Sequence, residues 1–212
     1  MRLFHDRTDA GRQLAERLGG YANRNDVVVL GLPRGGVPVA AQVASRLAAP
    51  LDVFLVRKLG VPGHVELAMG AVAPGGVEVL NHELIADLGI SPATVAGIAA
   101  AERIELERRD RVFRGGRPFP ELAGKTVIVV DDGLATGATM EAAVTALRPM
   151  KPAEIVVAVP VGARETCDRF ERLADRVVCL ATPASFDAVG LWYEDFSQTT
   201  DDEVKQLLLG LS

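Results

Sequence analysis

The chain has 212 residues, 49% of them apolar and 24% charged, which is the balance of a globular protein with a sizeable core. Its net charge of −5 argues against nucleic acid as the main partner. No apolar run approaches the roughly 18 residues of a membrane span, and no signal peptide is evident. The two cysteines have neither metal nor redox spacing, which suits reduced thiols. We therefore expect a single cytoplasmic domain over residues 1–212, with no nucleic-acid or membrane partner.

Strand-like and helix-like segments alternate along the chain, which predicts an α/β fold with a parallel sheet and helices on both of its faces. A helix is expected at 8–18, followed by a wholly apolar strand at 27–30. Residues 31–36 break that strand with glycine and proline, and a helix is expected from 37 to 47.

A second strand is expected at 51–56 and a third at 67–72, separated by a glycine-containing loop at 60–66. A mostly helical insertion, about 82–117, follows the third strand. The remaining expected elements continue the alternation: strand 126–130, a helix to about 150, strand 155–159, helix 163–173, strand 177–180, and a tail from 183 to 212 with a closing helix at 201–209.

Residues 127–139 read V-I-V-V-D-D-G-L-A-T-G-A-T and are the most informative stretch of the sequence. A buried parallel strand delivers its last residues to the carboxyl edge of the sheet, where open α/β folds bind ligands. Asp131 and Asp132 follow the strand directly. Neighbouring carboxylates repel each other unless a cation or a hydroxyl-rich ligand lies against them. This pair therefore predicts a ligand with hydrogen-bond donors.

The turn after the two acids has the composition of an anion site. Gly133 and Gly137 allow a tight turn and a close approach to a ligand, and Thr136 and Thr139 carry hydroxyl donors. A helix begins there, and its free N–H groups favour an anion. A ribose 5-phosphate fits both halves, with its hydroxyls on the acids and its phosphate at 136–139.

The alternatives are weaker. A lone Asp-Gly pair often forms only a turn, but this stretch combines four apolar residues, two acids, three spacers and Thr-Gly-x-Thr. Gly31 and Gly36 have the outer spacing of a P-loop, but Val37 stands where the lysine is required. No G-x-G-x-x-G opens a helix after a strand, so the sequence offers no support for nucleotide hydrolysis or hydride transfer.

The segment 127–139 resembles the phosphoribosyl-pyrophosphate (PRPP) signature of type I phosphoribosyltransferases at every defining position. The resemblance implies a Rossmann-like parallel-sheet core, with the tail from about 183 to 212 forming a hood over the base site. It implies that the following residues bind the ribose and 5-phosphate of PRPP: Asp131, Asp132, Gly133, Ala135, Thr136, Gly137, Ala138 and Thr139. It also implies a homodimer, and Mg²⁺ bound mainly through PRPP with Asp131 and Asp132 as further ligands.

A second loop, L-P-R-G-G, leaves the first strand and enters a helix, so its amides can also hold an anion. It is similar to the family's pyrophosphate loop, in which Arg34 would supply charge and Gly35 and Gly36 would expose N–H groups. Arg57 and Lys58 are similar to the Arg-Lys pair that adenine and orotate enzymes place beside the pyrophosphate. A plain turn and a basic surface pair are the alternatives.

Residues 60–66 lie where related enzymes carry a mobile loop that closes over the reacting centre. His64 could contact the pyrophosphate, and Glu66 could order the loop or hold a metal-bound water; surface roles are the alternative for both. The expected catalytic set is completed by Asp131, Asp132 and Lys58.

The acceptor is less defined. Ala135 stands where 6-oxopurine enzymes carry an acidic residue, which disfavours hypoxanthine and guanine. The tail offers candidates for base binding, which could instead simply pack the tail onto the core: Phe186, Asp187, Trp192 and Glu194. The expected function is Mg²⁺-dependent transfer of the phosphoribosyl group from PRPP to a nitrogenous base, with release of pyrophosphate, in nucleotide salvage. A non-catalytic PRPP or nucleotide sensor and a hydrolase or phosphorylase-like activity remain as alternatives.

Overall fold

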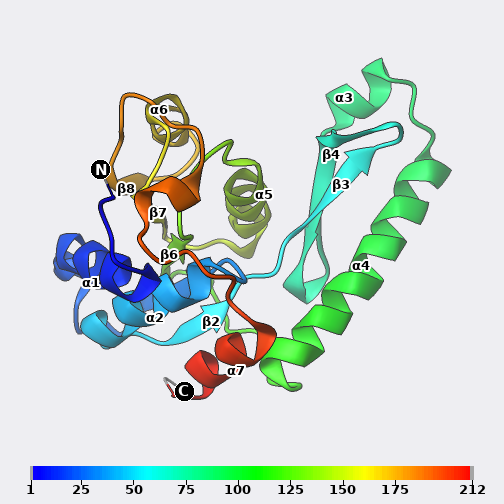
Figure 1. Cartoon of the computed structure of the whole chain (residues 1–212). Coiled ribbons are helices and arrows are strands. Elements are labelled where there is room, and N and C mark those ends of the chain that lie inside the picture. The colour runs from blue at the N-terminus through cyan, green and yellow to red at the C-terminus, as the bar shows by residue number, and fades with distance from the viewer. Residues whose placement is uncertain (1, 211–212) are drawn as a thin grey trace.

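The structure is a computed structural model that describes residues 2–210, except for the side chains of Val65 and Glu66. A five-stranded parallel sheet in the order β2-β1-β6-β7-β8 lies at its centre, as expected (Figure 1). Its strands are β1 (Val27–Gly31), β2 (Leu51–Val53), β6 (Thr126–Val130), β7 (Glu154–Val161) and β8 (Arg176–Ala181). Every residue of β1 and β6 is buried, which explains why their sequences are continuous apolar runs.

Helices cover both faces of this sheet. Alternate strand residues face opposite sides, so Val29 and Ile128 pack with one pair of helices, while Leu30 and Val129 pack with the other. The first pair is α1 (Arg7–Arg17) and α2 (Gly36–Leu47), and the second is α5 (Ala138–Leu147) and α6 (Arg164–Phe170). We call the parallel sheet and these four helices the core.

Between β2 and β6 the chain leaves the core and forms an arm, residues 57–114 (Figure 1). A three-stranded antiparallel sheet, in the order β3-β4-β5, forms one side of it. The elements of the arm are β3 (Arg57–Val61), β4 (His64–Ala73), β5 (Val77–Leu80), α3 (His82–Asp87) and α4 (Pro92–Arg114). The helical insertion is therefore present, but it packs on a separate small sheet.

The expected strands of this region are partly wrong. The second strand ends at Val53 and not at residue 56. The next strand, residues 57–61, belongs to the antiparallel sheet. The third expected strand is longer than 67–72 and pairs with β3 and β5, not with the parallel sheet. The expected loop at 60–66 contains only the turn between β3 and β4, at which Gly63 has a φ of +80°. The strand β5 has no counterpart in the expectation.

The end of α4 joins the arm to the core. Arg114 is 3% exposed, and its guanidinium forms ion pairs with Asp52 at 2.9 Å and Asp110 at 2.5 Å. It also donates to the backbone oxygen of Val53 at 2.8 Å. Because Asp52 and Val53 belong to β2, this single side chain ties the helix to the edge of the parallel sheet.

The tail returns to the core and then reaches the arm. Leu3 and Phe4 donate their backbone N–H groups to the Trp192 oxygen, and the rings of Phe4 and Tyr193 lie 5.4 Å apart. The closing helix α7 (Asp201–Gly210) contacts α2 and α4. The short 3-10 helices are η1 (Gly19–Tyr21), η2 (Pro74–Gly76), η3 (Arg148–Met150) and η4 (Val189–Trp192). Over residues 2–210, no helix has the length and apolar character needed to cross a bilayer.

Candidate active site

The two ligand loops that the sequence predicts lie against each other at the carboxyl edge of the sheet. Leu32 donates its N–H to the Val130 oxygen at 2.9 Å. A Cβ added to Gly35 would lie 2.0 Å from Oδ2 of Asp132, and one added to Gly36 would lie 2.6 Å from the Val130 oxygen. Glycine is therefore required at both positions for the L-P-R-G-G loop to reach the two acids. The peptide bond between residues 33 and 34 is cis.

The second acid, Asp132, is held by an arginine from α1. Arg7 donates from Nε to Oδ2 of Asp132 at 2.9 Å, with Nη2 at 2.8 Å from the same oxygen. The two side chains are only 12% and 15% exposed. Arg7 also lies over the Phe196 ring, and Tyr193 donates its hydroxyl to the Asp132 backbone oxygen at 2.6 Å. One oxygen of this carboxylate is thus committed to the protein.

Sequence reasoning missed Arg7 and Tyr193. Arg7 lies 125 residues from Asp132 and Tyr193 lies 61 residues away. Neither belongs to a recognisable motif, because only the tertiary fold brings the first helix and the tail over the end of β6. No local signal could have identified them.

The first acid, Asp131, lies beside the loop that leads from β6 into α5. It lines a pocket of about 160 Å³ together with residues 133–140 and Val189. Burial raises its pKa, and the adjacent carboxylate of Asp132 raises it further. Burial also raises the pKa of Asp132, but there the Arg7 guanidinium opposes the shift. The two acids are therefore unequal: Arg7 forms an ion pair with Asp132, and among the described residues none is formed with Asp131.

The loop between the acids and α5 is shaped by α6. Thr166 donates its hydroxyl to the Ala135 oxygen, and Arg169 donates to the Thr136 oxygen, both at 2.7 Å. Gly137 has a φ of +76°, and a Cβ there would lie 2.6 Å from the Phe170 ring. The carbonyls of Ala135 and Thr136 are thus held by α6. The N–H of Ala138 donates to the Thr136 hydroxyl at 3.4 Å, and the next N–H groups of the first turn of α5 remain as anion donors.

The predicted hood residues are engaged mainly in packing. The side chain of Val189 lies where a Cβ on Gly133 would fall, so η4 covers the start of the ligand loop. Phe186 and Trp192 stack with ring centroids 6.3 Å apart and join the cluster around Tyr193. Glu194 hydrogen bonds with His5 at 2.9 Å, and Asp187 is exposed. A role of these residues toward a base stays a prediction.

The predicted basic residues lie in different places. Arg34 is beside α7, with Nη1 3.7 Å from Oδ1 of Asp201. Arg57 pairs with Glu102 of α4 at 2.6 Å and lines a pocket of about 50 Å³ that Thr139 also lines. Arg34 belongs to the L-P-R-G-G loop itself, and Arg57 shares its small pocket with Leu32 and Pro33 of that loop.

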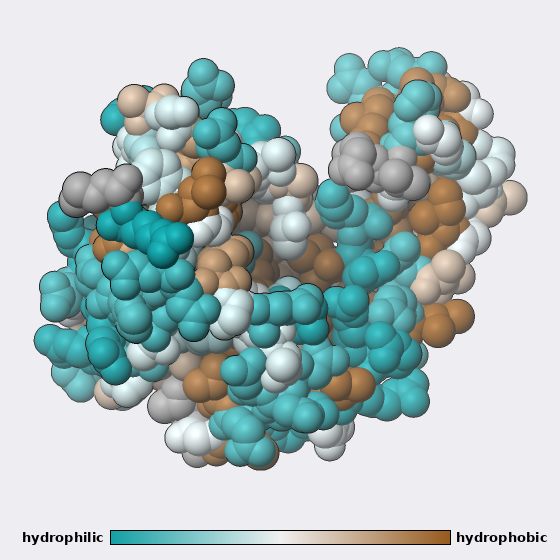
Figure 2. Space-filling model, viewed as in Figure 1, coloured by the Kyte–Doolittle hydropathy of each residue, from teal (hydrophilic) through white to brown (hydrophobic). Residues whose placement is uncertain are grey.

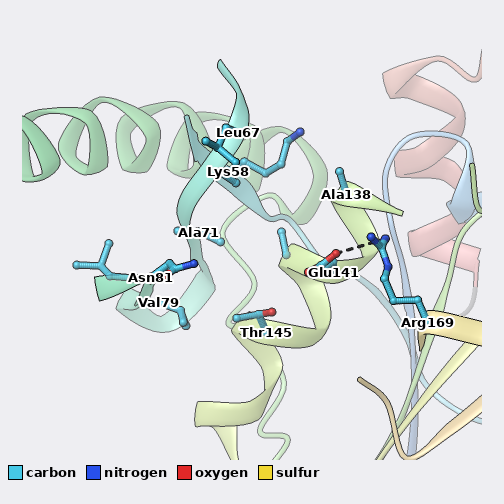
Figure 3. Close-up of a pocket in the computed structure, with 13 residues that line it drawn as sticks. Lys58, Leu67, Ala71, Val79, Asn81, Ala138, Glu141, Thr145 and Arg169 are labelled. Atoms are coloured by element: carbon cyan, nitrogen blue, oxygen red, sulfur yellow. Dashed lines mark ion pairs between the residues drawn. The ribbon is translucent and has the colours of Figure 1, made fainter. Parts of the chain in front are cut away.

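Lys58 lies apart from them. It lines a pocket of about 480 Å³ between the arm and α5. Figure 3 shows this pocket, with Lys58 on the arm opposite Ala138 and Glu141 of α5, and the ion pair from Glu141 to Arg169. Arg57 and Lys58 follow each other in one strand and therefore line separate pockets.

The hairpin formed by β3 and β4 carries the remaining candidates. His64 is exposed at the start of β4, and the side chain of Glu66 lies outside the described part of the chain. Figure 2 shows the molecule hollowed between the core and the arm, with apolar side chains at the bottom of the hollow. Closure of this hairpin over a ligand stays a prediction.

The donor set suits Mg²⁺ only as an ion shared with a phosphorylated ligand. No group of three or more His, Cys, Asp or Glu that could hold a metal occurs among the residues described. Asp131 forms no ion pair within the described part of the chain. Mg²⁺ commonly binds through one or two carboxylates together with substrate phosphates and water. The site therefore fits this ion if a ligand supplies most of the oxygens.

A family model described as "Phosphoribosyl transferase domain" matches residues 4–193. The chain belongs to this family. The matched range includes both ligand loops, the arm and η4. The type I phosphoribosyltransferase fold expected from residues 127–139 is thereby confirmed, while the subgroup stays open.

Relatives extend the family assignment to the whole chain. Proteins of two Mycobacterium tuberculosis strains, MT0597 and Rv0571c, carry the provisional name phosphoribosyl transferase and are 51% identical over 208 residues. The match covers 98% of this chain and 47% of theirs, so the chain spans about half the length of these relatives. The crystal structure of TT1426 from Thermus thermophilus is 44% identical with a TM-score of 0.91, and each chain is covered completely.

A more distant structure supports the fold alone. The Aquifex aeolicus protein AQ2163 is 14% identical with a TM-score of 0.50, over 82% of this chain and 73% of its own. The complete coverage of TT1426 includes residues 57–114, so the arm is shared with that relative.

Proposed function

We propose that the chain transfers the 5-phosphoribosyl group from PRPP to a nitrogen of an acceptor base and releases pyrophosphate, with Mg²⁺ as cofactor. One observation supports the proposal most strongly: three features lie together at one edge of the sheet. They are Asp131, the amide-lined turn 136–139 and the L-P-R-G-G loop. Together they offer an acceptor for ribose hydroxyls between two anion sites. PRPP has its charged groups in this order.

Each loop has a distinct task in the proposed reaction. The N–H groups at the start of α5 bind the 5-phosphate, and Asp131 accepts hydrogen bonds from the ribose hydroxyls. The L-P-R-G-G loop and Arg34 bind the pyrophosphate. The acceptor nitrogen then forms a bond to C1 of the ribose, while the bond from C1 to the pyrophosphate oxygen breaks and its electron pair leaves with pyrophosphate.

Charge stabilisation is the main contribution of the chain. The ribose ring becomes positive as the C1–O bond breaks, and the nearby carboxylate of Asp131 favours that charge. Mg²⁺, when bound, offsets the negative charge that grows on the leaving group. Holding acceptor and PRPP in line can contribute up to roughly 7–11 kcal/mol to lowering the barrier.

The acceptor is proposed by exclusion. Ala135 has no group that could protonate a base, and Thr166 holds its backbone oxygen. A base that needs a proton from this loop is therefore disfavoured, which includes 6-oxopurines. We also propose a cytoplasmic homodimer that acts in nucleotide salvage; the two free cysteines suit a reducing compartment.

A sensor that binds PRPP without turnover is the second candidate. The ion pair between Arg7 and Asp132 favours it, because it neutralises one of the two carboxylates that would stabilise a positive ribose ring. One experiment separates the two functions. The protein is incubated with Mg²⁺, PRPP and a panel of bases, and pyrophosphate release is measured beside PRPP binding.

Release with one base, lost in Asp131→Asn, supports the transferase. Saturable binding without release from any base supports the sensor. No binding of PRPP in the presence of Mg²⁺ would remove both proposals. Sedimentation of the same protein tests the homodimer, and a single monomeric species would contradict it.

A further inference from the structure

Helix α4 of the arm brings two arginines to the L-P-R-G-G loop. Arg108 and Arg109 line a pocket of about 260 Å³ together with Arg34. Arg109 also lines the pocket of about 50 Å³ that Arg57 and Thr139 line. Arg109 therefore borders both the loop after β1 and the first turn of α5.

These arginines are not fully matched by acids. Arg108 donates to both oxygens of Glu105, at 2.7 and 2.8 Å, and Arg109 donates from Nε to one of them at 3.0 Å. Two guanidinium groups thus share one carboxylate. Within the described part of the chain, neither Nη atom of Arg109 has a hydrogen-bond partner. Its side chain is 42% exposed, so it is free to meet a ligand.

The third arginine of the pocket is weakly paired. Among residues 2–210, the one acid that Arg34 contacts is Asp201, with Nη1 3.7 Å from Oδ1, which is too long for a hydrogen bond. Asp201 lies in the first turn of α7 and is itself one of the residues that line the pocket. The only carboxylate among the lining residues thus comes from the tail, and an incoming anion would compete with it.

We propose that Arg109 binds the pyrophosphate group of PRPP, so that the arm completes the site. This rests on the proposed function of the chain. A guanidinium presents parallel N–H donors that match the oxygens of a phosphate group, and the two free Nη atoms supply such donors. Asp201 lines the same pocket and would compete with the pyrophosphate for Arg34.

The test compares ligands that differ only in the pyrophosphate. Binding of PRPP, of pyrophosphate and of ribose 5-phosphate is measured by calorimetry with Mg²⁺ present, for the full chain and its variants. In Arg109→Gln we expect roughly ten- to hundredfold weaker binding of PRPP and of pyrophosphate, because the charged hydrogen bonds to the pyrophosphate are lost. Binding of ribose 5-phosphate should be unchanged, because α5 and Asp131 hold that ligand.

Two further variants control the result. Arg111→Gln removes the same charge from the same helix, but this side chain is 77% exposed and is not among the residues that line either pocket, so all three affinities should be kept. Asp201→Asn removes the competing carboxylate and should tighten pyrophosphate binding severalfold. Arg109→Lys keeps the positive charge but lacks the parallel N–H donors of a guanidinium. Its pyrophosphate affinity should therefore lie between those of wild type and Arg109→Gln.

The experiment distinguishes failure of this inference from failure of the proposed function. Wild-type protein that binds all three ligands, with an Arg109→Gln variant of unchanged pyrophosphate affinity, overturns this inference alone. Equal losses for pyrophosphate and ribose 5-phosphate in that variant overturn it as well, because they would reflect disturbed folding. Wild-type protein that binds none of the ligands overturns the proposed function and this inference together.

Discussion

The core and the arm are built on different principles, although both contribute to the proposed site. The strands β1 and β6 of the core are buried over their whole length, whereas β3 and β5 of the arm are mostly half-exposed. The core holds the ligand loops by backbone hydrogen bonds and close-packed glycines. The arm holds its arginines on α4, which contacts α7 and is tied to β2 through Arg114. The core therefore fixes the position of the two ligand loops. The arginines of the arm reach these loops only if α4 is correctly attached to the core.

The largest expected effect concerns that attachment. In Arg114→Ala the carboxylates of Asp52 and Asp110 would lose their shared cation at the edge of β2. Removing one partner of a buried ion pair costs about 3–5 kcal/mol of stability. The free energy of unfolding, measured with urea, should fall by that amount, and hydrogen exchange should accelerate first in α4.

The matched control is Arg111→Ala in the same helix. Its contact to Glu107 is 3.9 Å long and both side chains are largely exposed, so the change should be about 0.5 kcal/mol or less. If both variants lost the same stability, Arg114 would not be the link between arm and core.

A pair of glycines compares the two regions directly. Gly137 in the core and Gly75 in the arm have nearly the same φ, +76° and +75°. Alanine at either position therefore carries the same backbone cost, about 1–2 kcal/mol. At Gly137 the Phe170 ring lies 2.6 Å from the added Cβ, whereas no atom of the described residues lies within 4 Å of one added at Gly75.

We expect Gly137→Ala to lose about 2–4 kcal/mol, because overpacking adds to the backbone cost. It should also lose PRPP binding, since the loop that carries the phosphate donors must shift. Gly75→Ala should keep wild-type binding. Thermal unfolding and calorimetry on both variants measure this, and an equal loss of binding would mean that the arm governs the phosphate site.

The two regions also differ in how far the sequence predicted them. The apolar runs that end at Val130 and Leu30 identified buried strands, and the glycines after them identified ligand loops. The local sequence is sufficient there, because strand and loop are continuous in the chain. For the arm, Gly60 and Gly63 suggested a loop, and only the pairing of β3 with β4 makes it a hairpin.

The same reason explains which parts of the site were missed. Asp131 and the turn after it were found from one motif. Arg7, Tyr193 and Arg109 come from the first helix, the tail and the arm, and no pattern in the sequence connects them. The run of charges along α4 does not by itself show which residues reach the site, yet Arg109 lies beside the L-P-R-G-G loop. A residue's direction on a long helix depends on what the helix packs against.

The smallest expected effect is a difference between Asp131 and Asp132 in how each contributes to the pH dependence of stability. The raised pKa of Asp131 means that the folded protein keeps a proton at pH values where the unfolded chain has lost it. The free energy of unfolding should therefore decrease as the pH rises from the ordinary value near 4 through the raised pKa, and then level off. Over the same interval PRPP binding should strengthen, because only the carboxylate accepts hydrogen bonds from two ribose hydroxyls.

Asparagine at each position tests this inequality. Asp131→Asn removes a half-buried charge that forms no ion pair among the described residues. The variant should therefore be more stable than wild type at neutral pH and less dependent on pH, while PRPP binding is lost. Asp132→Asn leaves Arg7 without its counter-charge and should lose roughly 1.5–3 kcal/mol. Urea titrations between pH 4 and 8 distinguish the two. If both variants were destabilised alike, the acids would be equivalent, and the core would bind the ribose through the pair and not through Asp131.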